Sequence, residues 1–79
     1  MTFWEVLQQK LRLMRDNGMT NEEIAKIGDI SQSYVNLLLN KSPDLFRKVK
    51  FETLVKLFPE IFDEILRKYG AQGGGAGQA

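Results

Sequence analysis

The chain contains neither cysteine nor histidine among its 79 residues. Without cysteine it can form no disulfide bond and no thiolate metal site. Without histidine it lacks the commonest metal ligand and the usual general base near neutral pH. Carboxylates remain, but Glu22 and Glu23 are adjacent, so on a helix they would point about 100° apart and could not face each other. We therefore expect no enzyme, no metal and no cofactor.

Long apolar runs are absent as well. No stretch approaches the ~20 apolar residues that cross a bilayer as a helix, and no basic segment followed by an unbroken apolar run opens the chain. We therefore expect a cytoplasmic protein, associated with the nucleoid, and no membrane partner. Glycine is concentrated at the C-terminus, where residues 70–79 read GAQGGGAGQA. Because such sequence has nothing to bury, we predict one domain over 1–69 and a disordered tail or linker over 70–79.

Apolar residues recur at three- and four-residue steps in five segments. The first of these stripes consists of Trp4, Leu7, Leu11 and Met14, and it predicts a helix over 3–16 with these side chains in the core. Further helices are predicted over 21–27, 32–39, 51–58 and 59–69, and a loop anchored by Leu45 and Phe46 over 40–50. The expected fold class is all-α, a compact bundle of about five helices.

The segment from Thr20 to Asn40 carries the strongest local signals. Thr20 with Glu23 three residues later predicts a capping box, and Ser31 predicts a second N-cap. Gly28-Asp29 lies between the two short helices, and both residue types enter turn geometry at low cost. Each helix also has a pair of apolar residues spaced as a hydrophobic staple, Met19 with Ile24 and Ile30 with Val35. The pattern is typical of a helix-turn-helix, whose second helix usually enters the DNA major groove.

Residues 11–65 resemble the Xre/Cro family, the lambda-repressor-like helix-turn-helix domains of phage repressors and bacterial regulators. The family shows a basic first helix, a polar residue opening the second helix and a hydrophobic-Ala pair. A hydrophobic-Ser pair, polar or small residues and an Asn near the end of the third helix follow. The matching residues are Arg12, Arg15, Asn21, Ile24-Ala25, Ile30-Ser31, Gln32-Ser33-Tyr34-Val35 and Asn40-Lys41. The resemblance implies sequence-specific binding of double-stranded DNA by a transcriptional regulator.

Two positions depart from the family pattern. The turn glycine comes one place early, because Gly28 precedes Asp29; since Asp tolerates the left-handed region, we expect the turn to survive. Leu37 stands where the family often has a polar or basic residue. Its side chain could touch a thymine methyl group or another protein, and both alternatives remain open.

The candidate interface follows from the predicted helix 32–39. Gln32 and Asn36 carry amides that can read adenine bidentately, although an ordinary solvated helix face would carry the same residue types. Tyr34 could pack its ring on the scaffold or reach a phosphate, and Lys and Arg side chains position a protein on phosphates without reading sequence. The expected base contacts are Ser31, Gln32, Ser33, Asn36 and Leu37. The expected DNA-backbone contacts are Asn21, Tyr34, Asn40, Lys41, Arg47, Lys48 and Lys50.

The charge distribution supports one DNA-facing side, although the net charge is only +1. Basic residues gather on the first helix and over 41–50, whereas Glu60, Asp63 and Glu64 gather near the last helix. An ordinary mixed surface is the plain alternative. The competing function is a protein-interaction module with the same fold and weak or no DNA binding. It is favoured by the run 37–39, LLL, and by the lack of Arg or Lys in the third helix before Lys41.

Single modules of this kind gain specificity mainly by pairing on two half-sites. We therefore expect a symmetric homodimer, either in solution or only on DNA. The helix over 59–69 is the expected contact surface, because its apolar residues exceed one narrow stripe; they are Ile61, Phe62, Ile65 and Leu66. In a chain this small they could instead all fill the domain's own core. A C-terminal region beyond the tail could also supply dimerisation.

Overall fold

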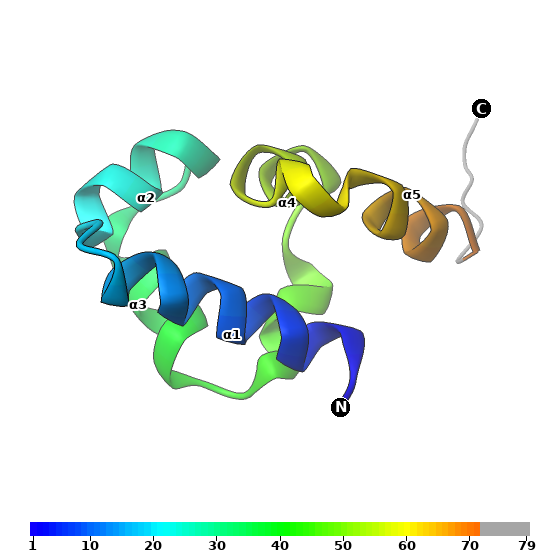
Figure 1. Cartoon of the computed structure of the whole chain (residues 1–79), viewed down its shortest axis with the longest axis horizontal. Coiled ribbons are helices and arrows are strands. Elements are labelled where there is room, and N and C mark those ends of the chain that lie inside the picture. Colours follow the sequence, from blue (N-terminus) through cyan, green and yellow to red (C-terminus); the bar gives the residue numbers. More distant parts are fainter. Residues whose placement is uncertain (72–79) are drawn as a thin grey trace.

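The computed structural model describes residues 1–71, and these form five α-helices and two 3-10 segments without a strand (Figure 1). The prediction of an all-α bundle of about five helices is confirmed. In Figure 1, α1 runs along one side of the molecule, α2 and α4 lie opposite it, and α5 extends beyond α4. In chain order the elements are α1 (Phe3–Asp16), α2 (Asn21–Gly28), α3 (Gln32–Asn40), η1 (Pro43–Lys48), α4 (Phe51–Leu57), η2 (Pro59–Ile61) and α5 (Phe62–Ala71).

Helix α1 begins and ends where the sequence predicts. Thr2 Oγ1 accepts from the Glu5 amide at 3.1 Å, and Glu5 Oε1 accepts from the Thr2 amide at 2.7 Å. This reciprocal pair satisfies two of the amides that a helix start leaves without partners. Hydrogen bonds to the carboxylate from the Thr2 backbone amide and, less strongly, from the Thr2 side chain favour its charged form and lower the pKa of Glu5. Just beyond the C-cap, Gly18 takes a positive φ of 101°, a conformation open to a residue without a Cβ.

The caps predicted for α2 and α3 are both present. Thr20 Oγ1 accepts from the Glu23 amide at 3.1 Å, and Glu23 Oε1 accepts from the Thr20 amide at 2.9 Å. Ser31 Oγ accepts from the Tyr34 amide at 3.0 Å. Each helix runs one residue past its predicted end, to Gly28 and to Asn40. The two helices expected from local signals alone therefore form with their expected starts.

Gly28 and Asp29, at the turn between α2 and α3, have different structural roles. Asp29 takes the left-handed conformation, with φ 58° and ψ 47°, so the turn survives without a glycine at that position. A Cβ on Gly28 would lie 3.1 Å from Leu57 Cγ, and the Gly28 carbonyl accepts from the buried Thr53 hydroxyl at 3.0 Å. The glycine that comes early therefore lets α2 approach α4 closely.

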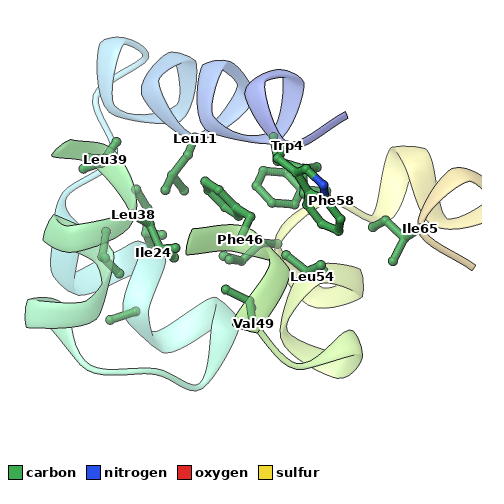
Figure 2. Packing of buried hydrophobic residues seen from close by; sticks show 14 residues of the cluster. Trp4, Leu11, Ile24, Leu38, Leu39, Phe46, Val49, Leu54, Phe58 and Ile65 are labelled. Atoms are coloured by element: carbon green, nitrogen blue, oxygen red, sulfur yellow. The ribbon is translucent and has the colours of Figure 1, made fainter. Parts of the chain in front are cut away.

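The core joins all the described helices around Phe46 (Figure 2). Phe46 is fully buried, and its ring centroid lies 6.3 Å from that of Phe58. Trp4, Leu7 and Leu11 of the predicted α1 stripe are buried, and Met14 packs against them. The other buried apolar residues are Ile24, Ala25, Val35, Leu38, Leu39, Val49, Leu54, Leu57 and Ile65.

Two predicted segments differ from the structure. The loop over 40–50 is wrong at Pro43–Lys48, which forms a 3-10 helix opened by Ser42 Oγ accepting from the Asp44 amide at 3.3 Å. Pro43 suits a first helical turn for two reasons. Its φ is already helical, and it has no backbone N–H group, which would lack a partner within the helix at this position. Pro59 likewise opens a short 3-10 segment, so the last α-helix begins at Phe62 and not at residue 59.

The structure separates the apolar residues of the last helix. Ile65 is fully buried and Ile61 is half-buried, whereas Phe62 and Leu66 are 41% and 49% exposed. The four residues therefore do not all fill the core. Helix α5 includes residues 70 and 71, and the rest of the predicted tail, 72–79, lies outside the described residues.

Candidate nucleic-acid interface

Helix α3 presents one polar face to solvent. Its side chains Val35, Leu38 and Leu39 are buried in the core. The exposed residues fall on the remaining face and are Gln32, Ser33, Asn36, Leu37 and Asn40. Ser31 precedes them, exposed and committed to capping through its hydroxyl. All five predicted base-contact residues therefore lie on the surface along a single helix and its cap.

Helix α1 holds the C-terminal end of α3. Gln8 is buried, and its Nε2 donates to the Leu38 carbonyl at 2.9 Å and to the Lys41 carbonyl at 2.7 Å. Arg12 Nη2 donates to the Leu39 carbonyl at 3.1 Å. The last carbonyls of a helix have no partner within it, so these bonds satisfy the end of α3 and set its position on α1.

A polar hollow lies along one edge of α3, between this helix and the C-terminal half of α1. Arg12 and Arg15 reach it from α1, and Asn36 and Asn40 reach it from α3; Asp16 and Leu39 complete the lining. The Arg15 guanidinium also donates to Asn21 Oδ1 at the start of α2. Two arginines thus stand beside the exposed face of α3, each held in place by a hydrogen bond to the protein.

An apolar hollow with basic sides lies along the other edge of α3. Leu37 faces it from α3 and Leu45 from η1, and Lys41 and Lys48 flank it, with Ser42 and Asp44. Leu37 is 39% exposed. The exposed face of α3 is therefore bordered by arginines on one edge and by lysines on the other.

Three predicted backbone contacts lie less directly on this surface. Arg47 lines neither hollow: its Nε donates to Asp44 Oδ1 at 3.3 Å, and its guanidinium carbon lies 5.3 Å from the Trp4 ring centroid. Lys50 is exposed at the start of α4, without a side-chain cap bond. Tyr34 is half-buried and packs against the core, which is the scaffold role considered for it.

Asn36 and Asn40 form a pair on the exposed face. Asn40 Nδ2 donates to Asn36 Oδ1 at 2.8 Å and to the Asn36 carbonyl at 2.9 Å. The bond orients the Asn36 amide while leaving its Nδ2 hydrogens and one lone pair of Oδ1 for other partners. Asn40, expected to touch a phosphate, thus positions Asn36.

Gln8, Arg12 and Arg15 were not among the predicted contacts, although the two arginines belong to the basic cluster expected on the first helix. The three residues are spaced i, i+4 and i+7, so they share one face of α1. That stripe runs beside the apolar stripe of the same helix. A polar stripe next to a core stripe could therefore have indicated the edge on which α3 packs.

No protein-family model, no curated protein and no solved structure matches this chain. The likeness to the Xre/Cro family thus rests on the residues named above. Within residues 1–71, no helix is long and apolar enough to cross a membrane. The same residues contain no cluster of three or more acidic side chains that could hold a metal ion.

Proposed function

We propose that this protein binds double-stranded DNA sequence-specifically, as a transcriptional regulator of prokaryotic or phage type acting in the cytoplasm on the nucleoid. Helix α3 would lie in the major groove. The observation that carries the proposal is the capped, polar face of α3 with Arg12 and Arg15 along one edge and Lys41 and Lys48 along the other. A helix that contacts base edges along its centre and phosphates at its sides needs this arrangement.

The two kinds of contact divide between the face and its edges. Gln32 and Asn36 supply amide groups suited to the N6 and N7 edge of adenine, and Leu37 supplies an apolar contact suited to a thymine methyl group. The basic side chains at the edges would meet phosphates on either side of the groove. They raise affinity without selecting sequence.

The proposed functional form is a symmetric homodimer. Phe62 and Leu66 on α5 are exposed large apolar residues one helical turn apart, which favours a contact surface there over a purely internal role. Two modules on half-sites about one helical turn of DNA apart would supply the specificity that one lacks.

A protein-interaction module is the second candidate. The exposed Leu37 and the neighbouring Leu45 line an apolar hollow along one edge of the surface proposed for DNA. An apolar centre with a polar rim is also how protein interfaces are built.

Selection from random duplexes followed by titration of the selected and a scrambled duplex tests the first function. Gln32→Ala and Asn36→Ala should each weaken binding to the selected duplex by about 5- to 150-fold, equivalent to the roughly 1–3 kcal/mol of one bidentate contact. Binding to the scrambled duplex should stay unchanged. Failure to select any sequence, with no duplex binding at low salt, would favour the protein-interaction module.

The basic edges are tested by salt dependence. Lys48→Ala should weaken binding to both duplexes alike and reduce the slope of log K against log salt by about one unit. Lys56→Ala is the matched control, because Lys56 is exposed on α4 beside the opposite flank of α1. Equal slopes for the wild type and Lys48→Ala would remove Lys48 from the interface.

Sedimentation, alone and with a two-half-site duplex, tests the dimer. Leu66→Gln should leave the fold intact, since the side chain is half exposed, while reducing two-to-one assembly. Strict one-to-one binding of the wild type on a palindromic site would exclude the dimer.

A further inference from the structure

A second surface of the molecule remains without a role in DNA binding. It is a groove on the flank of α1 away from α3, bounded by α1, by Ile27 of α2 and by the segment from α4 to η2. The α1 residues on this flank are Lys10, Leu13, Met14 and Asn17, whereas Gln8, Arg12 and Arg15 face α3. The two surfaces therefore lie on different sides of one helix.

The floor of the groove is apolar and accessible. Leu13 is 57% exposed and Ile27 is 41% exposed, whereas Leu11 of α1 and Ile24 of α2 are fully buried. Met14 and Met19 are half-buried between them. The space is about 430 Å³, within the range of binding pockets. Exposed apolar side chains converging from separate elements are typical of an interaction site, and methionine adapts readily to different partners.

The charges around the groove favour an acidic occupant. Lys10 lines it from α1 and is paired with Glu60 at 3.3 Å. Lys56 lines it from α4 and forms no ion pair with any residue of the described chain. The rim thus carries two lysines against one carboxylate, and a further carboxylate placed near Lys56 would complete the pairing.

The surrounding structure favours a helical occupant. A peptide that binds by adding a strand needs the free edge of a sheet, and residues 1–71 contain no strand. A groove between helices instead accepts the apolar stripe of an amphipathic helix. The chain's own last ten residues contain only Gly, Ala and Gln, so they offer neither a large apolar anchor nor an acidic side chain.

We propose that this groove binds an acidic amphipathic helix of another protein, independently of whether α3 binds DNA. Apolar side chains one turn apart would contact Leu13 and Ile27, and a flanking Glu or Asp would pair with Lys56. A second copy of this chain is a poorer occupant, because α5 docked into the groove would make a head-to-tail contact, which builds rings or filaments and not the symmetric dimer proposed above.

Two synthetic helical peptides test the proposal. Both peptides carry leucines spaced alternately three and four residues apart, so that these form one apolar stripe. In one peptide the residues flanking the stripe are glutamates, and in the other they are lysines. Titrated into isotope-labelled protein, the glutamate peptide should shift the resonances of Leu13, Ile27 and Lys56 and leave α3 unshifted. The expected affinity is on the order of tens to hundreds of micromolar, as for small interfaces. The lysine peptide should bind about two- to fivefold more weakly.

Three variants make the result specific. Leu13→Gln should weaken the glutamate peptide about tenfold, whereas the control Leu66→Gln, another exposed leucine, should not change it. Lys56→Glu should reverse the preference between the peptides. The proposal is overturned if neither peptide binds, if both bind equally, or if the two leucine variants behave alike. Self-association of the wild type that Leu13→Gln abolishes would assign the groove to a second copy and also overturn it.

Discussion

The two halves of this small protein are built by different means. From Phe3 to Asn40, every helix begins at a hydroxyl cap that accepts a local amide, at Thr2, Thr20 and Ser31. From Pro43 to Ala71, α4 begins at Lys50 without a side-chain cap bond, and two segments are 3-10 turns opened by proline. Every helix of the first half is therefore started by a side-chain cap, whereas among η1, α4 and η2 only η1 has one, at Ser42. Helix α4 depends instead on packing against the first half.

A few long-range contacts carry this dependence. Phe46 of η1 lies in the centre of the core, beside side chains from both halves (Figure 2). The Thr53 hydroxyl of α4 donates to the Gly28 carbonyl at the end of α2. The Tyr69 hydroxyl of α5 donates to the Val49 carbonyl at 2.8 Å, within the second half. Substitutions at contacts between the halves should lower the unfolding free energy more than substitutions at caps. A cap stabilises one helix, whereas a core contact holds the two halves together.

Phe46→Ala should have the largest effect. Removing a fully buried phenylalanine leaves a cavity and costs about 3–5 kcal/mol of unfolding free energy. We expect both halves to unfold in one transition, measured in urea by circular dichroism and by the fluorescence of Trp4, which is the only tryptophan and is buried. Leu45→Ala, half-buried in the same segment, is the milder control. Separate transitions by the two probes would show that the halves fold independently.

Gln8→Met should come second, because it removes a donor from inside the first half. The Leu38 and Lys41 carbonyls would lose their side-chain partner at about the same side-chain volume, at a cost of roughly 1–3 kcal/mol. Gln9→Met, on the exposed neighbouring position, should be nearly neutral. Equal stabilities of the two variants in urea would mean that α1 does not fix the end of α3 through Gln8.

Substitutions at the starts of α2 and α4 test directly whether side-chain caps distinguish the two halves. Thr20→Ala removes the cap of α2 and should cost about 1 kcal/mol. Lys50→Ala occupies the equivalent position before α4, where no side-chain cap exists, and should change the unfolding free energy little. If the two substitutions cost the same by chemical denaturation, the cap bonds are not what distinguishes the halves.

Tyr69→Phe removes one hydrogen bond and should lower the unfolding free energy by about 0.5–1.5 kcal/mol. Its pH dependence is more telling. Burial raises the pKa of Tyr69 above its ordinary value of 10.0, because it disfavours the phenolate. The neutral form thus contributes stability that is complete below pH 10.0 and is lost as the pH rises through the folded pKa. The wild type should lose stability over this alkaline window, and Tyr69→Phe should lose less; identical pH profiles would contradict it.

The bounds of α1 and the starts of α2 and α3 could be predicted because each depends on residues within one turn. Thr2 with Glu5 and Thr20 with Glu23 meet through three-residue spacing alone. The exposed face of α3 could be predicted for the same reason, since helical periodicity assigns Val35 and Leu38 to the core and Gln32 and Asn36 to the surface.

The edges of that face could not be predicted this way. Residues far apart in the chain form them: Arg12 and Arg15 lie beside Asn36, and Lys48 lies beside Leu37. The hydrogen bonds of Gln8 to the end of α3 could not be predicted either, because the accepting carbonyls are 30 and 33 residues away. Arg47 appeared equivalent to Lys48 in a basic run, yet its side chain contacts Asp44 and Trp4 and lines neither hollow.

Backbone capping and side-chain periodicity act over three or four residues, so local sequence was enough to predict the all-α class, the first three helix starts and the turn at Asp29. The packing of whole helices was needed to show which apolar residues of α5 are buried, why glycine stands at position 28, and which basic residues border α3. Those outcomes depend on the relative placement of whole helices, which is set by packing between residues distant in the chain. Residue spacing cannot specify that placement.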